Sequence, residues 1–110
     1  MAGYYKEEDL PRFAEMSEGA PRLWEKFNSW YSAVFESGAL TQREKSLIAL
    51  AVAHALECPY CIDAYTRDCL EKGSNLEQMT EAVHVASAIK GGSALVHGLQ
   101  MRNVEAKLSI

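Results

Sequence analysis

Apolar residues recur at intervals of three and four along most of the chain, which is the spacing of one face of an α-helix. No stretch alternates Val, Ile or Thr with polar residues as a half-buried strand does, and Gly and Pro fall mostly between the periodic segments. The pattern therefore predicts an all-α protein, a bundle of about six helices. We expect five helices at residues 7–17, 21–36, 41–56, 58–73 and 74–90. A sixth is expected after a break or kink at Gly91-Gly92.

Local signals support several of these boundaries. Thr41 and Glu44 have the spacing of a capping box, and so do Ser74 and Glu77. Residues 47–53 are apolar on all sides, which is typical of a central helix covered by its neighbours. An aromatic face on the segment 21–36 is expected to be buried; it is formed by Trp24, Phe27, Tyr31 and Val34 or Phe35.

Size and charge narrow the class of protein. The chain has 110 residues, 48% hydrophobic and 24% charged, which is typical of one globular domain spanning residues 1–110. Its net charge is −4 and it has no basic run, which argues against nucleic acid as a partner. The N-terminus does not resemble a secretory signal, and no apolar run approaches the ~20 residues of a membrane span. We therefore expect a cytoplasmic protein.

The segment Cys58-Pro59-Tyr60-Cys61 is the strongest chemical motif. Pro59 suits the first position of a helix, which makes Cys58 the N-cap and places Cys61 one turn further on. The positive end of the helix dipole favours a thiolate, so the pKa of the Cys58 thiol is expected to be low. Two thiols arranged in this way can form a disulfide and can reduce a peroxide or another disulfide.

Thiol chemistry also requires proton transfer. His54 lies four residues before Cys58 and is the best general base by residue type. Tyr65 follows Cys61 by four residues and therefore shares its helix face, either as a catalytic hydroxyl or as a core aromatic. Tyr60, Glu57 and His84 are further candidates for the pocket, although Glu57 also fits a solvated helix end and His84 a structural histidine.

Two stretches, Glu44–His54 and Cys58–Tyr65, resemble the AhpD-like alkylhydroperoxidases of the carboxymuconolactone decarboxylase superfamily. The segments Tyr4–Leu10, Leu23–Phe27 and Glu81–Gly98 are similar to a subgroup, the arsenosugar biosynthesis-associated peroxidase-like proteins. The resemblance implies an AhpD-like helical subunit that forms a symmetric homo-oligomer, often a trimer or hexamer. It also implies that Cys58 and Cys61 are a redox-active pair.

The family's proton relay is not carried over to this chain. Its glutamate, twelve residues before the first cysteine, corresponds to Ser46, and its histidine, four after the second, corresponds to Tyr65. His54 is then the replacement candidate, and Ser46 becomes a candidate pocket residue. The order of attack stays open, because the helix end favours Cys58 whereas the family relay is built around the second cysteine.

We therefore expect a cofactor-free thiol peroxidase or disulfide reductase that acts on a hydroperoxide or a partner's disulfide, with a thiol electron donor. The alternative is a non-catalytic helical scaffold serving a neighbouring pathway, with an incidental or inert thiol pair. A zinc site of His54, Cys58, Cys61 and Cys69 is disfavoured, since Cys69 lies about 12 Å along the helix from Cys61. Decarboxylase chemistry is disfavoured because no arginine is placed beside a general base.

Overall fold

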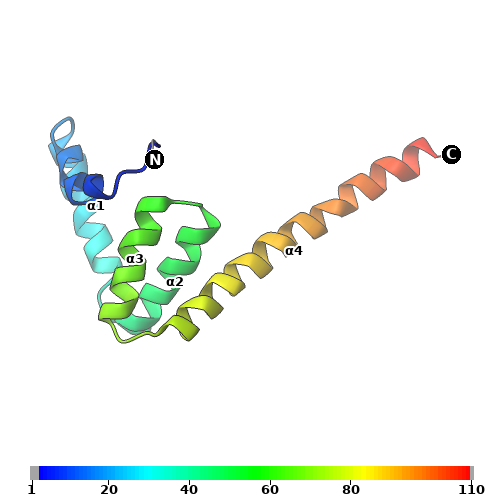
Figure 1. Ribbon diagram of the computed structural model, residues 1–110. Helices are drawn as coiled ribbons and strands as arrows, with labels where there is room; N and C mark the ends of the chain where they lie inside the picture. The colour runs from blue at the N-terminus through cyan, green and yellow to red at the C-terminus, as the bar shows by residue number, and fades with distance from the viewer. Residues whose placement is uncertain (1–2, 110) are drawn as a thin grey trace.

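The computed structural model describes residues 3–109, and five helices make up most of this range (Figure 1). The first is a 3-10 helix, and the other four are α-helices. The all-α prediction is confirmed, with five helices in the described residues rather than about six. They are η1 (Glu7–Ser17), α1 (Pro21–Val34), α2 (Gln42–Ala55), α3 (Pro59–Glu71) and α4 (Leu76–Leu108).

The difference in number arises at Gly91-Gly92, where the expected break is wrong. Helix α4 continues through both glycines for 33 residues, or about 50 Å at 1.5 Å per residue. A Cβ added at either glycine would meet nothing within 4 Å, so neither serves a turn or a close contact within this chain. A glycine inside a helix costs only about 0.5–1 kcal/mol relative to alanine, which is too little to end a long run of helix formers.

Capping explains how the helices begin. The box at Thr41 and Glu44 is confirmed: the Thr41 N–H donates to Glu44 Oε1 at 2.8 Å and the Glu44 N–H donates to Thr41 Oγ1 at 3.1 Å. The second box lies one residue later than expected, at Asn75 and Gln78. Ser74 is not the cap because its N–H already bonds to the Cys69 carbonyl at 2.9 Å.

That bond belongs to the end of α3, where Gly73 adopts a φ of 89°. The Gly73 N–H donates to the Leu70 carbonyl at 3.1 Å, which completes a Schellman motif together with the Ser74 bond. A residue with a Cβ would be strained in this left-handed conformation, so glycine suits the turn between α3 and α4.

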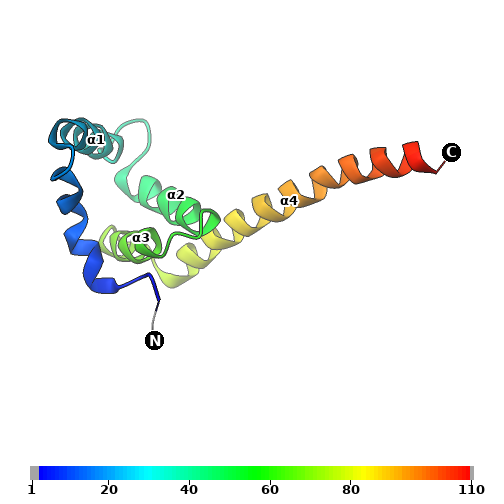
Figure 2. The same cartoon turned by 90° about the horizontal axis from the view of Figure 1, so that it is seen from above.

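The small core lies where α2 packs against α3 and against the first part of α4. Leu50, Cys69 and Met79 are its buried members, and Leu47 and Tyr65 pack against them. Helices α1 and η1 flank this core on the side of α3, and the rest of α4 extends the opposite way (Figure 2).

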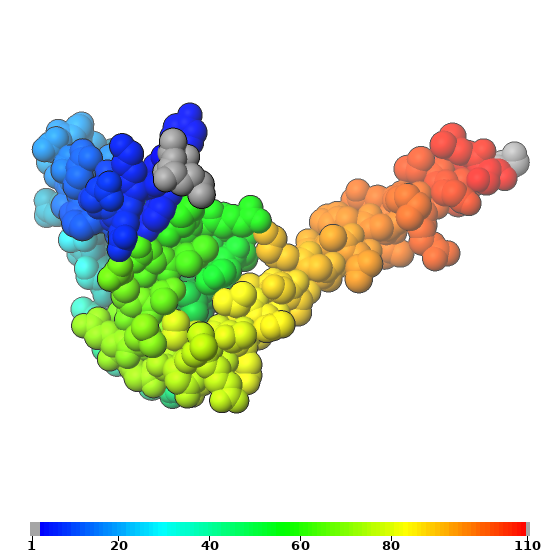
Figure 3. All heavy atoms as spheres, viewed as in Figure 1, coloured from blue at the N-terminus to red at the C-terminus, as the bar shows by residue number. Residues whose placement is uncertain are grey.

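The outer part of α4 stands away from the remainder of the chain (Figure 3). The radius of gyration is 18.9 Å, against about 13 Å for a compact chain of this length. The longest dimension is 59 Å. Although α4 is long, no helix within residues 3–109 combines the length and the apolar character needed to cross a bilayer.

Helix α2 is covered on one side only, which corrects the expectation that residues 47–53 form a fully surrounded helix. Leu50 and Ala53 are buried, whereas Ile48 and Val52 are each 50% exposed. The sequence pattern predicts a central helix covered by its neighbours. Within residues 3–109, the outer face of α2 stays half exposed beside a hollow shared with α1, because α4 contacts α2 with its first part and then departs (Figure 2).

Candidate functional site

A tight turn joins α2 to α3 and places the first cysteine. Leu56 ends α2, and Glu57 follows with a φ of 54°, in the left-handed region. The Glu57 N–H donates to the His54 carbonyl and the Cys58 N–H donates to the Ala53 carbonyl, both at 3.1 Å. These two bonds form a Schellman motif with glutamate where glycine is usual. The turn therefore brings Cys58 directly to the start of α3.

The cysteine pair occupies the first turn of α3. Cys58 is the N-cap, Pro59 is the first helical residue, and the Cys61 N–H donates to Cys58 Sγ at 3.2 Å. The two cysteines form a disulfide, with their Cα atoms 5.3 Å apart. The expected helix start and the mutual reach of the two sulfurs are both confirmed. A helix N-terminus has unpaired amides and a positive dipole end, so it stabilises a thiolate when the disulfide is reduced.

A hollow of about 570 Å³ opens beside the disulfide and gives solvent a path to it. We call it the cysteine hollow. Helix η1 forms one wall, α3 forms the other, and Tyr31 of α1 closes one end. The residues that line it are Asp9, Leu10, Arg12, Phe13, Glu15, Met16, Tyr31, Cys58, Tyr60, Cys61, Ala64 and Tyr65.

The N-terminal segment is held against α3 by its tyrosines. The Tyr5 hydroxyl donates to Asp63 Oδ2 at 2.6 Å, and the Tyr5 ring lies 4.8 Å from the Tyr60 ring. This hydrogen bond is the main reason that the pKa of Tyr5 is raised to about 12; the pKa of Asp63 is lowered first by its hydrogen bond with Arg67 and then by that with Tyr5. Arg67 pairs with both Asp63 and Glu7 and ties the start of η1 to the same helix.

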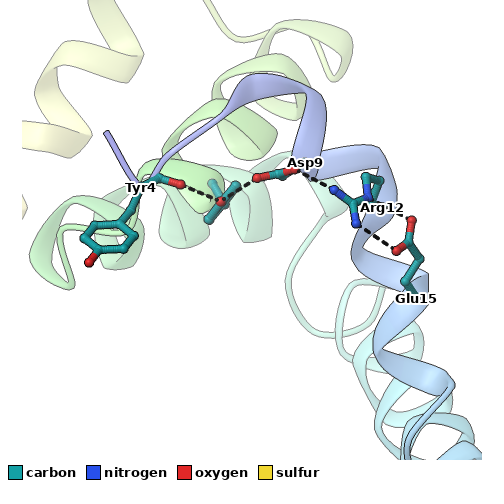
Figure 4. Close-up of polar contacts among 5 residues, drawn as sticks. Tyr4, Asp9, Arg12 and Glu15 are labelled. Atoms are coloured by element: carbon teal, nitrogen blue, oxygen red, sulfur yellow. Dashed lines mark hydrogen bonds and ion pairs between the residues drawn. The ribbon is translucent and has the colours of Figure 1, made fainter. Parts of the chain in front are cut away.

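Paired charges line the η1 side of the cysteine hollow. Arg12 bonds Glu15 Oε2 at 2.9 Å and Asp9 Oδ1 at 3.1 Å, and Tyr60 donates to Asp9 at 3.4 Å (Figure 4). The Arg12 guanidinium lowers the pKa of Glu15 mainly through its hydrogen bond. Arg12 is the one cation among the described residues that line this hollow, and both sides of its guanidinium are already paired with carboxylates.

Tyr65 lies one turn after Cys61 and lines the same hollow. Its hydroxyl forms a hydrogen bond with the hydroxyl of Tyr31, which comes from α1. Its ring stacks on Phe35 at 5.3 Å between ring centroids and 21° between planes. Burial raises the pKa of Tyr31, and the nearby Asp68 carboxylate raises it further.

Four of the residues expected from the sequence thus share one site: Cys58, Cys61, Tyr60 and Tyr65. His54 lies elsewhere on its helix, with Nδ1 2.9 Å from the Leu50 carbonyl, and it does not line the cysteine hollow. Its role as a base stays a prediction. Glu57 and His84 are exposed and lie outside this hollow, and Glu57 Oε1 is 3.4 Å from Lys90 Nζ.

Ser46 and Cys69 belong to the core. The Ser46 hydroxyl donates to the Arg43 carbonyl at 2.7 Å, and the Cys69 thiol donates to the Ser46 carbonyl at 3.3 Å. Both side chains are fully buried, and burial raises the pKa of the Cys69 thiol. Within residues 3–109, no three His, Cys, Asp or Glu side chains are grouped as metal ligands are.

Two parts of the site were not expected from the sequence. Tyr31 was assigned to a core aromatic face, and the residues Leu10, Phe13 and Met16 of η1 were given no part in the pocket. The helical spacing of Phe27, Tyr31 and Phe35 does place Tyr31 on an aromatic face, but the expectation that this face is buried is wrong: none of the α1 residues is buried, and Tyr31 is half-buried. Its contact with Tyr65 joins residues 34 positions apart, for which a single sequence contains no signal.

Comparison with known proteins identifies the family. The model of the carboxymuconolactone decarboxylase family matches residues 21–101. The chain belongs to this family. A curated relative from Paracoccus denitrificans, named "Uncharacterized protein 4 in cox locus", is 37% identical over 83 residues, which cover 76% of this chain and 75% of the relative. The sequence-based assignment to the superfamily is therefore confirmed.

Solved structures support the same conclusion for the carboxymuconolactone decarboxylase fold. A protein from Methanobacterium thermoautotrophicum superposes with a TM-score of 0.75 and 34% identity, over 78% of this chain and 97% of the other. A carboxymuconolactone decarboxylase family protein from Legionella pneumophila, in its apo form, has a TM-score of 0.70 and 27% identity over 94% of each chain. The fold thus extends beyond the segment that the family model matches.

Proposed function

We propose that this family member is a thiol-dependent peroxidase or disulfide reductase in which Cys58 and Cys61 alternate between dithiol and disulfide. The observation that carries the proposal is the position of the pair: both sulfurs lie in the first turn of α3 and line an open hollow. Within the family, we place the chain nearest the arsenosugar biosynthesis-associated peroxidase-like subgroup, on the Tyr4–Leu10 and Glu81–Gly98 segments.

The peroxidase half-reaction balances without a cofactor. A cysteine thiolate attacks the peroxide oxygen that carries hydrogen, so that an S–O bond forms while the O–O bond breaks. The sulfur becomes a sulfenic acid, and the leaving alkoxide takes a proton to become the alcohol. The second thiol then displaces water and forms the disulfide. Two thiols and one hydroperoxide thus give one disulfide, one alcohol and one water, and a dithiol donor restores the reduced pair.

The departing alkoxide requires a proton donor. Tyr65 supports the proposal because its side chain shares the cysteine hollow with both sulfurs. We assign it this role in place of the family histidine, and we keep His54 as the competing candidate. Because a reduced pair is the starting state, we also propose that the protein works in the reducing cytoplasm.

The reactivity of the reduced pair separates an enzyme from a scaffold. We expect the alkylation rate by iodoacetamide to rise with pH around a midpoint below the ~8.5 of an ordinary thiol, because the helix N-terminus stabilises the thiolate. The buried Cys69 supplies an internal control and should stay unmodified in the folded protein. If both Cys58 and Cys61 titrate near ~8.5, the thiols are ordinary and the scaffold is favoured.

A homo-oligomer is the second part of the proposal, and the uncovered surfaces support it. Large apolar side chains are exposed on the outer part of α4, among them Leu95 at 82% and Leu99 at 58%. The same chain leaves Ile48, Val52 and Leu56 exposed on α2. Since both the projecting helix and the uncovered face are present in every copy, a second copy is the partner that fits both. The same surfaces favour the scaffold alternative.

A further inference from the structure

The Tyr31–Tyr65 pair borders three hollows, one of which, of about 410 Å³, also contains Cys61 together with Ile48 and Val52 of α2. Both tyrosines line the cysteine hollow, and both also line a second hollow of about 450 Å³ that contains Asp68 and Lys72. The two hydroxyls are hydrogen-bonded to each other. The pair therefore joins the space beside the disulfide to a polar space on the other side of the same aromatic wall.

The rings around this pair restrict how it can move. Tyr65 is stacked on Phe35 at 5.3 Å, and Tyr31 contacts Phe35 at 5.1 Å and Phe27 at 5.4 Å. These contacts fix the ring planes but leave the Tyr65 hydroxyl to be oriented by its hydrogen bond. Tyr31 provides that bond from a different helix.

We infer that Tyr31 is a positioning residue for the proposed reaction: its hydroxyl holds the Tyr65 phenol at the cysteine hollow and replaces the proton that Tyr65 gives up. This inference rests on the proposed peroxidase function. When the O–O bond breaks, the alkoxide takes the Tyr65 proton and the resulting tyrosinate takes the Tyr31 proton. Tyr31 regains a proton from solvent through the hollow beside Asp68, so no charge remains on the pair.

The surroundings of Tyr31 suit this role. Burial, and then the Asp68 carboxylate, raise the pKa of Tyr31, so its phenol keeps its proton and can hold the Tyr65 hydroxyl by a hydrogen bond until the tyrosinate forms. Asp68 is itself paired with Lys72 at 2.5 Å. A carboxylate and an ammonium therefore lie at the solvent end of the path by which Tyr31 regains its proton. Tyr31 was expected only as part of a core face, and packing alone does not require its hydroxyl.

The test compares two reactions of the same reduced thiols in Tyr31→Phe, Tyr65→Phe and the double variant. Oxidation by tert-butyl hydroperoxide needs a proton for its leaving group, whereas alkylation by iodoacetamide releases iodide and needs none. We expect Tyr65→Phe to slow oxidation roughly a hundredfold and Tyr31→Phe roughly tenfold. The double variant should match Tyr65→Phe, because Tyr31 acts through Tyr65. Alkylation rates should stay unchanged.

Three controls make the outcome decisive. Tyr4→Phe removes the hydroxyl of a fully exposed tyrosine and should change neither reaction. His54→Gln tests the competing donor, and loss of oxidation in that variant with none in Tyr65→Phe overturns the inference. For a variant that does not fold, the wild-type protein in heavy water tests the proton-transfer step that Tyr31 is inferred to serve: with the reactive thiol fully ionised, a solvent isotope effect of roughly twofold is expected for oxidation and none for alkylation.

Several results would overturn the role of Tyr31. They are an unchanged oxidation rate in Tyr31→Phe, an equal slowing of oxidation and alkylation, an effect that multiplies with that of Tyr65→Phe, or the absence of an isotope effect. A wild-type protein whose thiols alkylate but do not react with hydroperoxide contradicts the proposed peroxidase function itself, and the inference falls with it. The two failures are therefore distinguishable.

Discussion

Replacing Cys58 by serine should slow reduction of a hydroperoxide by more than about a thousandfold. A serine hydroxyl in the same position is a far weaker nucleophile than a thiolate, and the hydrogen bond that Cys58 Sγ accepts within residues 3–109 comes from the Cys61 N–H rather than from a base. Cys58 is favoured as the attacking sulfur because it caps α3 and accepts the Cys61 N–H at 3.2 Å. The measurement is the peroxide consumed per minute with dithiothreitol as electron donor.

The Cys61→Ser variant should behave differently and so reveal the order of events. Its Cys58 still attacks the peroxide but has no partner thiol, so one sulfenic acid per chain accumulates and is trapped by dimedone. Cys69→Ser is the matched control, since a hydroxyl can keep the bond that the Cys69 thiol donates to the Ser46 carbonyl. Sulfenic acid in Cys58→Ser and none in Cys61→Ser would assign the attack to Cys61.

Replacing Leu95 and Leu99 by glutamate should dissociate the protein into smaller species. In an isolated chain, both side chains are already exposed and the change would cost little. In an oligomer that covers α4, each buried leucine contributes roughly 1.5–3 kcal/mol, and a charge in its place is strongly unfavourable. Size-exclusion chromatography with light scattering would measure the mass of the wild type, of the double variant and of the control Gln100→Glu.

The expected masses follow from the 12.2 kDa chain. We expect the wild type and Gln100→Glu to elute as a homo-oligomer, with a trimer or hexamer as the family resemblance implies. The double variant should elute at lower mass and lose helical content, since an isolated helical extension is marginal in water. A wild-type protein with the mass of one chain at micromolar concentration would contradict the assembly.

Local rules were sufficient where a few neighbouring residues decide the structure. The Thr41–Glu44 capping box and the helix start at Cys58-Pro59 depend on hydrogen bonds within one turn, so the sequence predicts them. The same applies to the disulfide, because residues three positions apart at a helix start are within reach. These features include the part of the site that carries the proposed chemistry.

Local rules failed where competing choices differ by little energy. Two glycines at residues 91–92 indicated a break, but the helix formers on both sides maintain α4. The second capping box moved from Ser74 to Asn75 because the Ser74 N–H is used by the end of α3. In both cases the sequence offered two acceptable solutions, and the continuation of a neighbouring helix decided between them.

Contacts between distant segments could not be predicted at all. The Tyr31 hydroxyl meets Tyr65 from another helix, and Tyr5 meets Asp63 across 58 positions. Likewise, η1 forms a wall of the cysteine hollow although nothing in residues 7–17 indicates a role in thiol chemistry. Periodicity shows which face of a helix is buried but not which partner it meets. For the same reason, His54 was favoured by spacing and residue type, although its ring lies outside the hollow.

The most direct test of the redox pair is to count free thiols in the fully reduced protein before and after one equivalent of tert-butyl hydroperoxide. The chain has three cysteines, and only Cys69 lies outside the pair. Titration after unfolding should therefore fall from three thiols per chain to one, with peptide mapping placing the new disulfide between Cys58 and Cys61. Retention of three thiols would contradict the proposed peroxidase.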